Sequence, residues 1–306
     1  MSSKDIDFTV IIPHRDTLHF LPKLFHSLPE SDRIEILLID NSFVPIKRED
    51  VDTDKKFKLL YSSPERGAGG ARNEGLEHAH GKWLIFVDAD DYLPEDAFEI
   101  FYNNFNSDAD VIYFGMDGIY ADTGERSDRG DKYSQLVKDY LSGKKSEMDL
   151  RLGFASPCSK MVRRELVDRH QIRYDEVVAS NDVYFSLLTG YYANKIDAVD
   201  KITYIATVSR GSLTKRRDLS VVQSRFEVNL RRNKFLKEHN LSHYQSSVMF
   251  FLFYARKYGY KNFIAFIKML LHFRQNPFIG ANRWLKTYLK HRNKSQKDSK
   301  YFINHS

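Results

Sequence analysis

The chain has 306 residues, 42% of them hydrophobic and 29% charged, which is the composition of a globular protein with a sizeable core. Its one cysteine, Cys158, excludes an intramolecular disulfide and fits a reducing compartment. The N-terminus lacks the apolar stretch of a signal peptide. The longest apolar run, residues 248–255, is far shorter than the ~20 residues that a spanning helix needs, so we expect no single-pass membrane helix.

The net charge of +6 hides two parts of opposite sign. Residues 210–306 hold 21 Lys and Arg against 4 Asp and Glu, whereas residues 1–209 hold 26 against 37. An acidic part needs a metal ion to hold an anionic substrate, and a basic part is attracted to an anionic surface or polymer. The charge distribution therefore predicts two regions with separate tasks.

Strand-like and helix-like segments alternate along the first part of the chain. Strands are expected at residues 8–12, 34–39, 57–61, 83–87 and 111–114, and helices at residues 18–28, 68–79 and 94–105. This alternation predicts an α/β fold with a mixed, mostly parallel sheet that helices cover on both faces. Ligands bind at the carboxyl ends of the strands in such sheets, so the residues directly after the strands are the first candidates for a site.

The later part of the chain has weaker signals. Residues 115–150 are polar and dotted with glycine, and we expect a variable surface excursion there. Short elements are expected at residues 160–168 and 182–191, and a late strand at residues 202–208. From residue 219 onward hydrophobic residues recur at three- and four-residue steps, which predicts helices.

An acidic motif follows the most apolar strand directly. Asp88 and Asp90, within Asp-Ala-Asp-Asp, can face one hard cation from a tight turn and leave positions for water and phosphate oxygens. Such a cation neutralises a diphosphate leaving group. The same spacing occurs elsewhere, for example at Asp108 and Asp110, so the pattern alone leaves helix capping open. The position at the end of a strand favours a metal site.

Two further segments carry polar groups at the ends of predicted elements. Asp40 follows the second strand, where an acid can accept hydrogen bonds from a ribose or a base; a plain Asx-turn is the alternative. Residues 65–73 form a glycine-rich turn that leads into a helix. The first N–H groups of such a helix can bind an anion, and Arg72 could reach a phosphate. A turn that merely packs closely is the alternative.

Taken in order, these motifs resemble the nucleotide-binding half of family-two glycosyltransferases, which have the GT-A fold. The resemblance covers residues 8–105 and is carried by VIIP, IDNS and RGAGGARNEGLEHAHGKWLIFVDADD. It implies that Pro13, Asp40, Arg72 and Asp88 bind a nucleotide-sugar. It also implies that Asp90, together with Asp88, binds Mn²⁺ or Mg²⁺.

The chain departs from the family pattern at two places. The tyrosine and asparagine that usually follow the first-strand proline are replaced by His14 and Arg15. The usual Asp-Asp-Gly-Ser reads Asp-Asn-Ser-Phe, with Asn41 as its second residue. Contacts with the nucleotide base from these two turns therefore do not carry over residue by residue.

Three further segments resemble the family's acceptor half. Residues 156–166, around Lys160, resemble its lysine-containing strand, and residues 180–185 stand where the family commonly has Glu-Asp-x-x-Phe. This implies that Asp182 is the general base that deprotonates the acceptor hydroxyl. Asn181 replaces the usual acid, and capping of the following helix is the alternative role of Asp182. Residues 209–214 resemble a loop that closes over the donor diphosphate, with a simple basic turn as the alternative.

The basic C-terminal region mixes aromatic residues with cations. Helices packed on a catalytic domain show the same pattern by default. The excess charge favours amphipathic helices that bind an anionic membrane surface. Nucleic acid could use the same charge, but the aromatic residues alternate with aliphatic ones instead of forming stacking platforms. We therefore predict a membrane partner and no nucleic acid.

The predicted organisation is a GT-A domain at residues 1–214 and a basic amphipathic helical region at residues 215–306. The GT-A domain comprises a nucleotide-binding half at residues 8–105 and an acceptor half at residues 106–214. The predicted enzyme is a metal-dependent, inverting hexosyltransferase. Its donor is a nucleotide-diphosphate sugar, with UDP as the expected nucleotide. Its acceptor is a glycan or glycolipid hydroxyl, such as that of a lipid-linked saccharide in cell-surface polysaccharide synthesis. The expected location is cytoplasmic, peripheral on the inner face of the cell membrane.

Two other functions agree with parts of the sequence. A sugar-nucleotide pyrophosphorylase also binds nucleotides on an α/β sheet, but its glycine-rich loop follows the first strand, where this chain has PHRDT. A basic nucleic-acid-binding protein would account for the C-terminal region and leave the ordered motifs of the first half unexplained.

Overall fold

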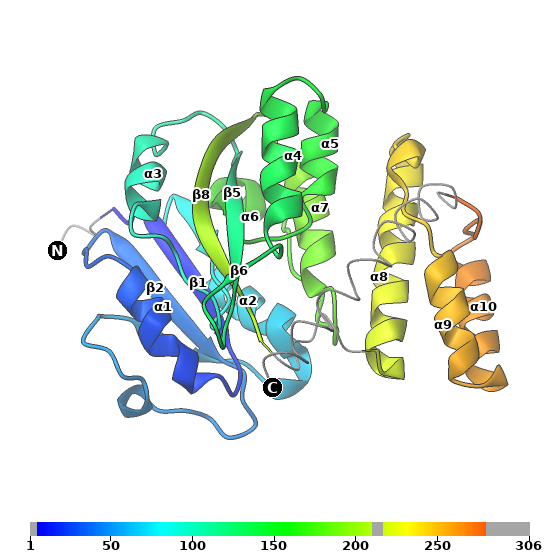
Figure 1. Ribbon diagram of the computed structural model, residues 1–306, viewed down its shortest axis with the longest axis horizontal. Helices are drawn as coiled ribbons and strands as arrows, with labels where there is room; N and C mark the ends of the chain where they lie inside the picture. Colours follow the sequence, from blue (N-terminus) through cyan, green and yellow to red (C-terminus); the bar gives the residue numbers. More distant parts are fainter. Residues whose placement is uncertain (1–4, 210–216, 280–306) are drawn as a thin grey trace. The chain divides into compact units, whose positions relative to one another are not determined.

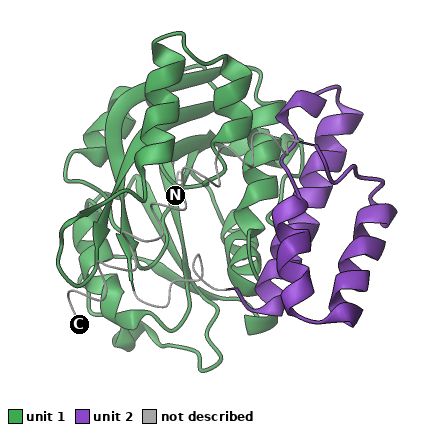
Figure 2. Cartoon of the chain, turned by 45° about the vertical axis from the view of Figure 1, so that its right-hand side comes forward, with its two compact units in different colours: residues 1–216 green, residues 217–306 purple. Residues whose placement is uncertain are grey.

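The computed structural model describes residues 5–209 and 217–279. The chain divides into two compact units, residues 1–216 and residues 217–306 (Figure 2). The first unit is built around a sheet flanked by helices, and the described part of the second unit is helical (Figure 1).

The sheet of the first unit is mixed. Its strands are β1 (Phe8–His14), β2 (Ile34–Asp40), β3 (Lys58–Tyr61), β4 (Trp83–Phe86), β5 (Val111–Tyr120), β6 (Arg126–Ser127), β7 (Lys160–Arg163) and β8 (Ile196–Val208). The strand order is β3-β2-β1-β4-β7-β5-β6, and β8 pairs with β5. Strands β1, β2, β3 and β4 pair with one another in parallel. Strand β5 is parallel to β8. Strand β7 is antiparallel to both β4 and β5. The predicted α/β fold with a mixed sheet is confirmed.

Helices cover both faces of this sheet (Figure 1). They are α1 (Leu21–Ser27), α2 (Gly67–Glu77), α3 (Ala97–Asn103), α4 (Asp131–Leu141), α5 (Glu147–Gly153), α6 (Arg164–Arg169) and α7 (Asn181–Tyr192). Side chains alternate across a strand, so β1 contributes Phe8 and Val10 to a core with α1 and α3, and Ile11 to a second core with α2 and α7. The two cores account for the near-continuous apolar sequence of β1.

The prediction that residues 115–150 form a polar surface excursion is wrong. Strand β5 continues to Tyr120, and helices α4 and α5 follow. Each helix needs only a narrow apolar face, and Val137 and Leu150 are fully buried. The hydroxyl of Ser134 also donates to the carbonyl of Met116 and accepts from its N–H, which fixes α4 against β5.

The late strand is longer than predicted. Strand β8 begins at Ile196 rather than at residue 202. Its first part carries exposed charged residues such as Asp197 and Asp200, which mask the strand pattern, while Ala198 is buried. Pairing with β5 over the length of that strand holds this part in the sheet.

The second unit confirms the helices predicted from residue 219. They are α8 (Leu219–Glu238), α9 (Met249–Lys257) and α10 (Tyr260–His272). Phe226 of α8 stacks on Phe266 of α10, with ring centres 4.9 Å apart. The buried Asn233 bonds the backbone N–H and carbonyl of Ser246, which fixes the segment before α9. Among the described helices, none combines the length and apolarity that a membrane span requires.

Candidate functional site

The site lies at one edge of the sheet, where the carboxyl ends of β1, β2 and β4 meet. These strands are parallel, and His14 at the end of β1 lies opposite Asp40 at the end of β2. Asp88 comes two residues after the end of β4. Pro13 is the penultimate residue of β1 and pairs with Ile39. Parallel pairing thus brings together three segments that are far apart in the sequence.

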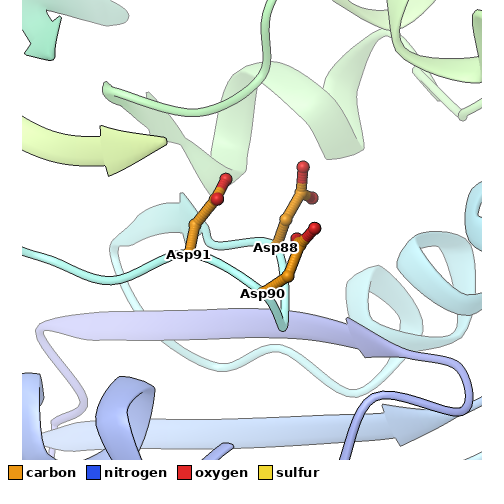
Figure 3. Close-up of side chains that lie close together, drawn as sticks. All are labelled: Asp88, Asp90 and Asp91. Carbon is orange, nitrogen blue, oxygen red and sulfur yellow. The ribbon is translucent and has the colours of Figure 1, made fainter. Parts of the chain in front are cut away.

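Three carboxylates share the loop after β4 (Figure 3). One oxygen from each of Asp88, Asp90 and Asp91 lies within 4.8 Å of the others, and no other such acidic or histidine cluster occurs in residues 5–209 and 217–279. Burial, together with the negative charge of Asp88, raises the pKa of Asp90 to about 6. Gathered carboxylate oxygens form the donor set that Mg²⁺ and Mn²⁺ prefer. The residues present therefore fit a divalent cation.

The three carboxylates differ in what they already bind. Asp91 is buried and accepts hydrogen bonds from the hydroxyl of Tyr204 and the N–H of Thr207, both at 2.6 Å. Asp88 accepts from Arg72 at 2.5 Å. Asp90 has no hydrogen bond or ion pair with the side chain of another described residue. Asp90 thus keeps both oxygens for a cation, and Asp88 keeps one.

Arg72 of α2 connects two parts of the site. It is 5% exposed, and its two terminal nitrogens donate to Asp88 at 2.5 Å and to the side-chain oxygen of Asn181 at 2.8 Å. Burial lowers the pKa of this guanidinium, but Asp88 and the other acidic groups around it together outweigh burial and raise the pKa above the usual value. Arg72 is therefore a permanent cation that joins the loop after β4 to the start of α7.

The carboxylate of Asp40 already accepts hydrogen bonds from the end of β1 and from its own turn. It accepts from the ring of His14 at 2.9 Å, from the hydroxyl of Ser42 at 2.7 Å and from the N–H of Ile46 at 2.9 Å. Burial alone would raise the pKa of Asp40, but these hydrogen bonds lower it below the usual value. The neighbouring Asn41 donates to the carbonyl of Ser63 at 2.5 Å, and its side-chain oxygen is buried without a hydrogen-bond partner.

The two departures from the family pattern lie side by side in the structure. The His14 ring binds Asp40, and the guanidinium of Arg15 lies 4.8 Å from the ring centre of Phe43. The N–H of Asp16 donates to the hydroxyl of Ser42 at 3.1 Å. The unusual residues at the end of β1 therefore contact those at the end of β2. The two departures from the family pattern are coupled through these contacts.

Two glycines of α2 are accounted for by close packing, Gly69 in its first turn and Gly75 near its end. A Cβ on Gly69 would lie 2.0 Å from the backbone oxygen of Asp175, and one on Gly75 would lie 2.6 Å from a side-chain carbon of Ile11. Neither distance is sterically possible. These positions require glycine whether or not an anion binds at the helix start, which supports the packing alternative.

Asp182 is the second residue of α7 and is partly buried. The residue that precedes the helix, Ser180, has a left-handed conformation with φ of 64°, and no side-chain cap hydrogen bond is formed. Since α7 begins at Asn181, Asp182 lies within the first turn of the helix and is not its N-cap residue. Burial raises its pKa above the usual value, which makes it a stronger base.

Lys160 of β7 is buried beneath this region. Its ammonium donates to the carbonyl of Phe154 at 2.8 Å and lies 4.8 Å and 5.1 Å from the ring centres of Phe154 and Tyr113. Burial lowers its pKa to about 7. The resemblance singled out this lysine, but nothing in the local sequence indicated its burial.

Tyr204 is the functional candidate that the sequence reasoning missed. It belongs to β8, is 1% exposed, and bonds the loop after β4 at both Asp91 and Asp88. In the sequence, the one indication of Tyr204 is its position within the predicted strand at residues 202–208.

The loop expected to close over the donor, at residues 209–214, lies outside the described residues from residue 210 onward.

Comparison with known proteins identifies a family. A family model described as glycosyl transferase family 2 matches residues 9–171. The putative glycosyltransferase EpsH of Bacillus subtilis is 24% identical over 218 residues, which cover 68% of this chain and 62% of that protein. The poly(ribitol-phosphate) beta-N-acetylglucosaminyltransferase TarS of Staphylococcus aureus is 25% identical over 217 residues, or 67% of this chain and 36% of TarS. The chain thus spans less than two thirds of the length of either relative.

Solved structures share the fold. A crystal structure of a TarS fragment in complex with UDP-GlcNAc has a TM-score of 0.57 at 20% identity, covering 89% of this chain and 75% of that one. The mannosyltransferase PcManGT from Pyrobaculum calidifontis, in complex with GDP-Man and Mn²⁺, has a TM-score of 0.50 at 13% identity, covering 94% and 83%. These likenesses show the GT-A fold.

Proposed function

We propose that this chain, which belongs to glycosyl transferase family 2, transfers a sugar from a UDP-sugar to an acceptor hydroxyl with inversion. One observation carries this proposal. Arg72 joins the carboxylates after β4 to Asn181, the residue before Asp182. A candidate metal-binding loop and a candidate base thereby belong to one site.

The metal proposal rests on Asp90 and Asp88. Asp90 has no competing partner among the described side chains, and Asp88 keeps one oxygen free of Arg72. These two residues would hold Mn²⁺ or Mg²⁺, which supplies the positive charge that a departing diphosphate needs. Arg72 adds a fixed cation to the same edge, which favours binding of an anionic donor.

The nucleotide proposal takes Asn41 as the direct contact with the base. The His14 ring and the N–H of Ile46 each donate to one oxygen of Asp40. The side-chain oxygen of Asn41, by contrast, is buried without a hydrogen-bond partner. An amide oxygen accepts from an N–H of a base as a carboxylate does. Asp40 and Pro13 would then contribute to donor binding by shaping this turn. The complexes of TarS with UDP and with UDP-GlcNAc support UDP as the nucleotide.

The base proposal concerns Asp182. An inverting transfer is one displacement, in which the acceptor oxygen attacks the anomeric carbon as the diphosphate departs from the opposite side. That oxygen is a poor nucleophile until its proton is removed. Burial raises the pKa of the Asp182 carboxylate, and Asp182 follows Asn181, which is bonded to Arg72. It is therefore our candidate for the group that removes the proton.

The acceptor and location proposals rest on charge. Residues 239–297 contain 11 Lys and Arg and no Asp or Glu. On the described part of this segment, Tyr260 and Leu271 of α10 are 77% and 68% exposed, beside the exposed Lys261 and Lys268. A surface of apolar residues and cations suits an anionic lipid headgroup layer. We therefore propose a peripheral protein on the cytoplasmic face of the membrane, with a glycan or glycolipid acceptor.

The donor proposal is tested by incubating the protein with a panel of nucleotide-sugars and measuring nucleotide release, with Mn²⁺ and with a chelator. We expect release from a UDP-sugar that depends on the metal. Release from a GDP-sugar alone would contradict the assignment of UDP. Release that the chelator does not affect would contradict the role of Asp88 and Asp90.

A further inference from the structure

The end of β8 is hydrogen-bonded to the candidate metal-binding loop at both ends of that loop. Tyr92 and Ile205 exchange two backbone hydrogen bonds, at 2.9 and 3.3 Å. The N–H of Thr207 and the hydroxyl of Tyr204 both donate to Asp91 at 2.6 Å. The hydroxyl of Tyr204 also accepts from the N–H of Asp88 at 3.1 Å. Strand β8 therefore holds both ends of the Asp-Ala-Asp-Asp turn.

Asp91 has a different task from its two neighbours. Each of its oxygens already accepts a hydrogen bond from β8, whereas Asp90 has no such partner among the described side chains. A carboxylate with a hydrogen bond on each oxygen keeps a second lone pair on each, but the two bonds fix its orientation toward β8. Building on the proposed function, we infer that Asp91 and Tyr204 are positioning residues, which fix the loop so that Asp88 and Asp90 alone present oxygens to the metal.

The hydroxyl of Tyr204 is the necessary part of this arrangement. It donates one hydrogen bond and accepts another, so it satisfies the buried carboxylate of Asp91 and the partly buried N–H of Asp88 together. Phenylalanine would preserve the ring in the core that Tyr204 shares with Ala89, but it would leave both groups without this partner. Groups that orient metal ligands commonly change metal affinity about 10- to 100-fold when removed.

A matched control exists within the same sheet. Tyr113 of β5 is fully buried, as Tyr204 is, but its hydroxyl has no hydrogen-bond partner. Tyr113→Phe therefore removes a buried hydroxyl without disconnecting the metal-binding loop. Any effect that is common to both variants comes from packing or burial and not from positioning.

The experiment titrates Mn²⁺ into the full chain in the presence of UDP, with calorimetry as the readout, for wild type, Tyr204→Phe and Tyr113→Phe. We expect Tyr204→Phe to weaken Mn²⁺ binding by about 10-fold or more, and Tyr113→Phe to match wild type. UDP binding without metal should be equal in all three proteins. In turnover assays, the Mn²⁺ concentration for half-maximal rate should rise in Tyr204→Phe, with kcat recovering at saturating Mn²⁺.

A second pair of variants separates positioning from coordination. Asp91→Asn keeps an oxygen for Thr207 and a polar group for Tyr204, so it should retain Mn²⁺ binding within several-fold of wild type. Asp90→Asn should lose it. Loss of binding in both variants would make Asp91 a ligand and overturn the inference, as would equal Mn²⁺ affinity in Tyr204→Phe and Tyr113→Phe. A wild-type protein that binds no Mn²⁺ with UDP would overturn the metal proposal itself, and this inference with it.

Discussion

The two units of the chain use charged residues in opposite ways. The first unit buries several of them, including Asp40, Arg72, Asp91, Arg151 and Lys160, and each has a hydrogen-bond partner within the protein. In the described part of the second unit, residues 217–279, the buried polar residues are the uncharged Asn233, Gln245 and Gln275. From residue 239 onward its described cations are exposed, and residues 239–297 contain no acidic residue.

This difference predicts how each unit responds to mutation. A buried charge acts over short distances in a medium of low dielectric constant, so its loss has a large and specific effect. Exposed cations act together, each contributes little, and salt screens them. Single substitutions should therefore be decisive in the first unit and graded in the second.

The largest effect is expected from Asp90→Ala. Among the three carboxylates of the loop after β4, Asp90 is the one that has no hydrogen bond with another described side chain. Without it, turnover and the metal-dependent part of UDP binding should disappear. Asp108→Ala is the control, because Asp108 lies in another Asp-x-Asp pair and its exposed carboxylate bonds Lys195, away from the loop after β4. Turnover assays and UDP binding with Mn²⁺ would check this, and equal losses in both variants would contradict the metal assignment.

The next largest effect is expected from Asp182→Asn. Asparagine keeps the shape of the side chain but cannot accept the proton of the acceptor hydroxyl. Transfer should fall about 10²- to 10⁴-fold, while the affinity for UDP with metal and the melting temperature stay close to wild type. Near-normal turnover would show that Asp182 is not the base and would leave the fold assignment unchanged.

Lys160 predicts a pH-dependent stability. Its pKa is about 7 in the folded chain and 10.5 in its unperturbed state, so between these values the unfolded chain binds a proton that the folded chain does not. The free energy of unfolding should therefore rise with pH across this window, by up to about 1.4 kcal/mol per pH unit. Lys160→Met should remove this contribution.

Urea unfolding at pH 7, 8 and 9, chosen within the window that the pKa of Lys160 defines, would measure this contribution as the difference between wild type and Lys160→Met. The comparison cancels the titration of other groups that both proteins share. A difference that does not vary with pH would mean that Lys160 stays protonated in the fold, and it would weaken the contrast between the two units.

The smallest effect per residue is expected in the second unit. Reversing the charge of the exposed Lys261 and Lys268 of α10 should weaken sedimentation with vesicles of phosphatidylglycerol and phosphatidylcholine, by roughly fivefold for each unit of charge lost at the surface. The matched control reverses Lys144 and Lys145, which are exposed on the first unit, and should change little.

High salt should weaken vesicle binding of the wild-type protein further. Binding that neither salt nor the Lys261 and Lys268 changes affect would reduce the second unit to ordinary packed helices. Equally strong binding to vesicles of phosphatidylcholine alone would likewise exclude a role for the cations.

Much of the fold could be predicted because its signals are local. Strand β1 and strand β4 are short apolar runs, and the residues directly after them could be assigned to one edge of a parallel sheet. Helices α4 and α5 could not be predicted, since α4 buries only Val137 among its eleven residues. Most residues of such a helix are polar, so its sequence predicts a loop.

The contacts of the site could be predicted less well, since they join residues that are distant in the sequence. Arg72 and Asn181 are 109 positions apart, and Tyr204 and Asp91 are 113 apart. The sequence shows that Asp40 follows a strand, but it does not show that His14 and Ile46 occupy its oxygens. A motif locates a residue at the site and leaves its partners undetermined.

The bridge made by Arg72 has a consequence for protein engineering. A chimeric glycosyltransferase can be built by joining the donor-binding half of one enzyme to the acceptor-binding half of another. In this chain one guanidinium serves Asp88 on the donor side and Asn181 on the acceptor side. An acceptor half with glutamate at position 181 would give Arg72 a second carboxylate and draw its charge away from Asp88. Exchanging acceptor specificity therefore means transplanting the residue at position 181 and the residue at position 72 as a pair.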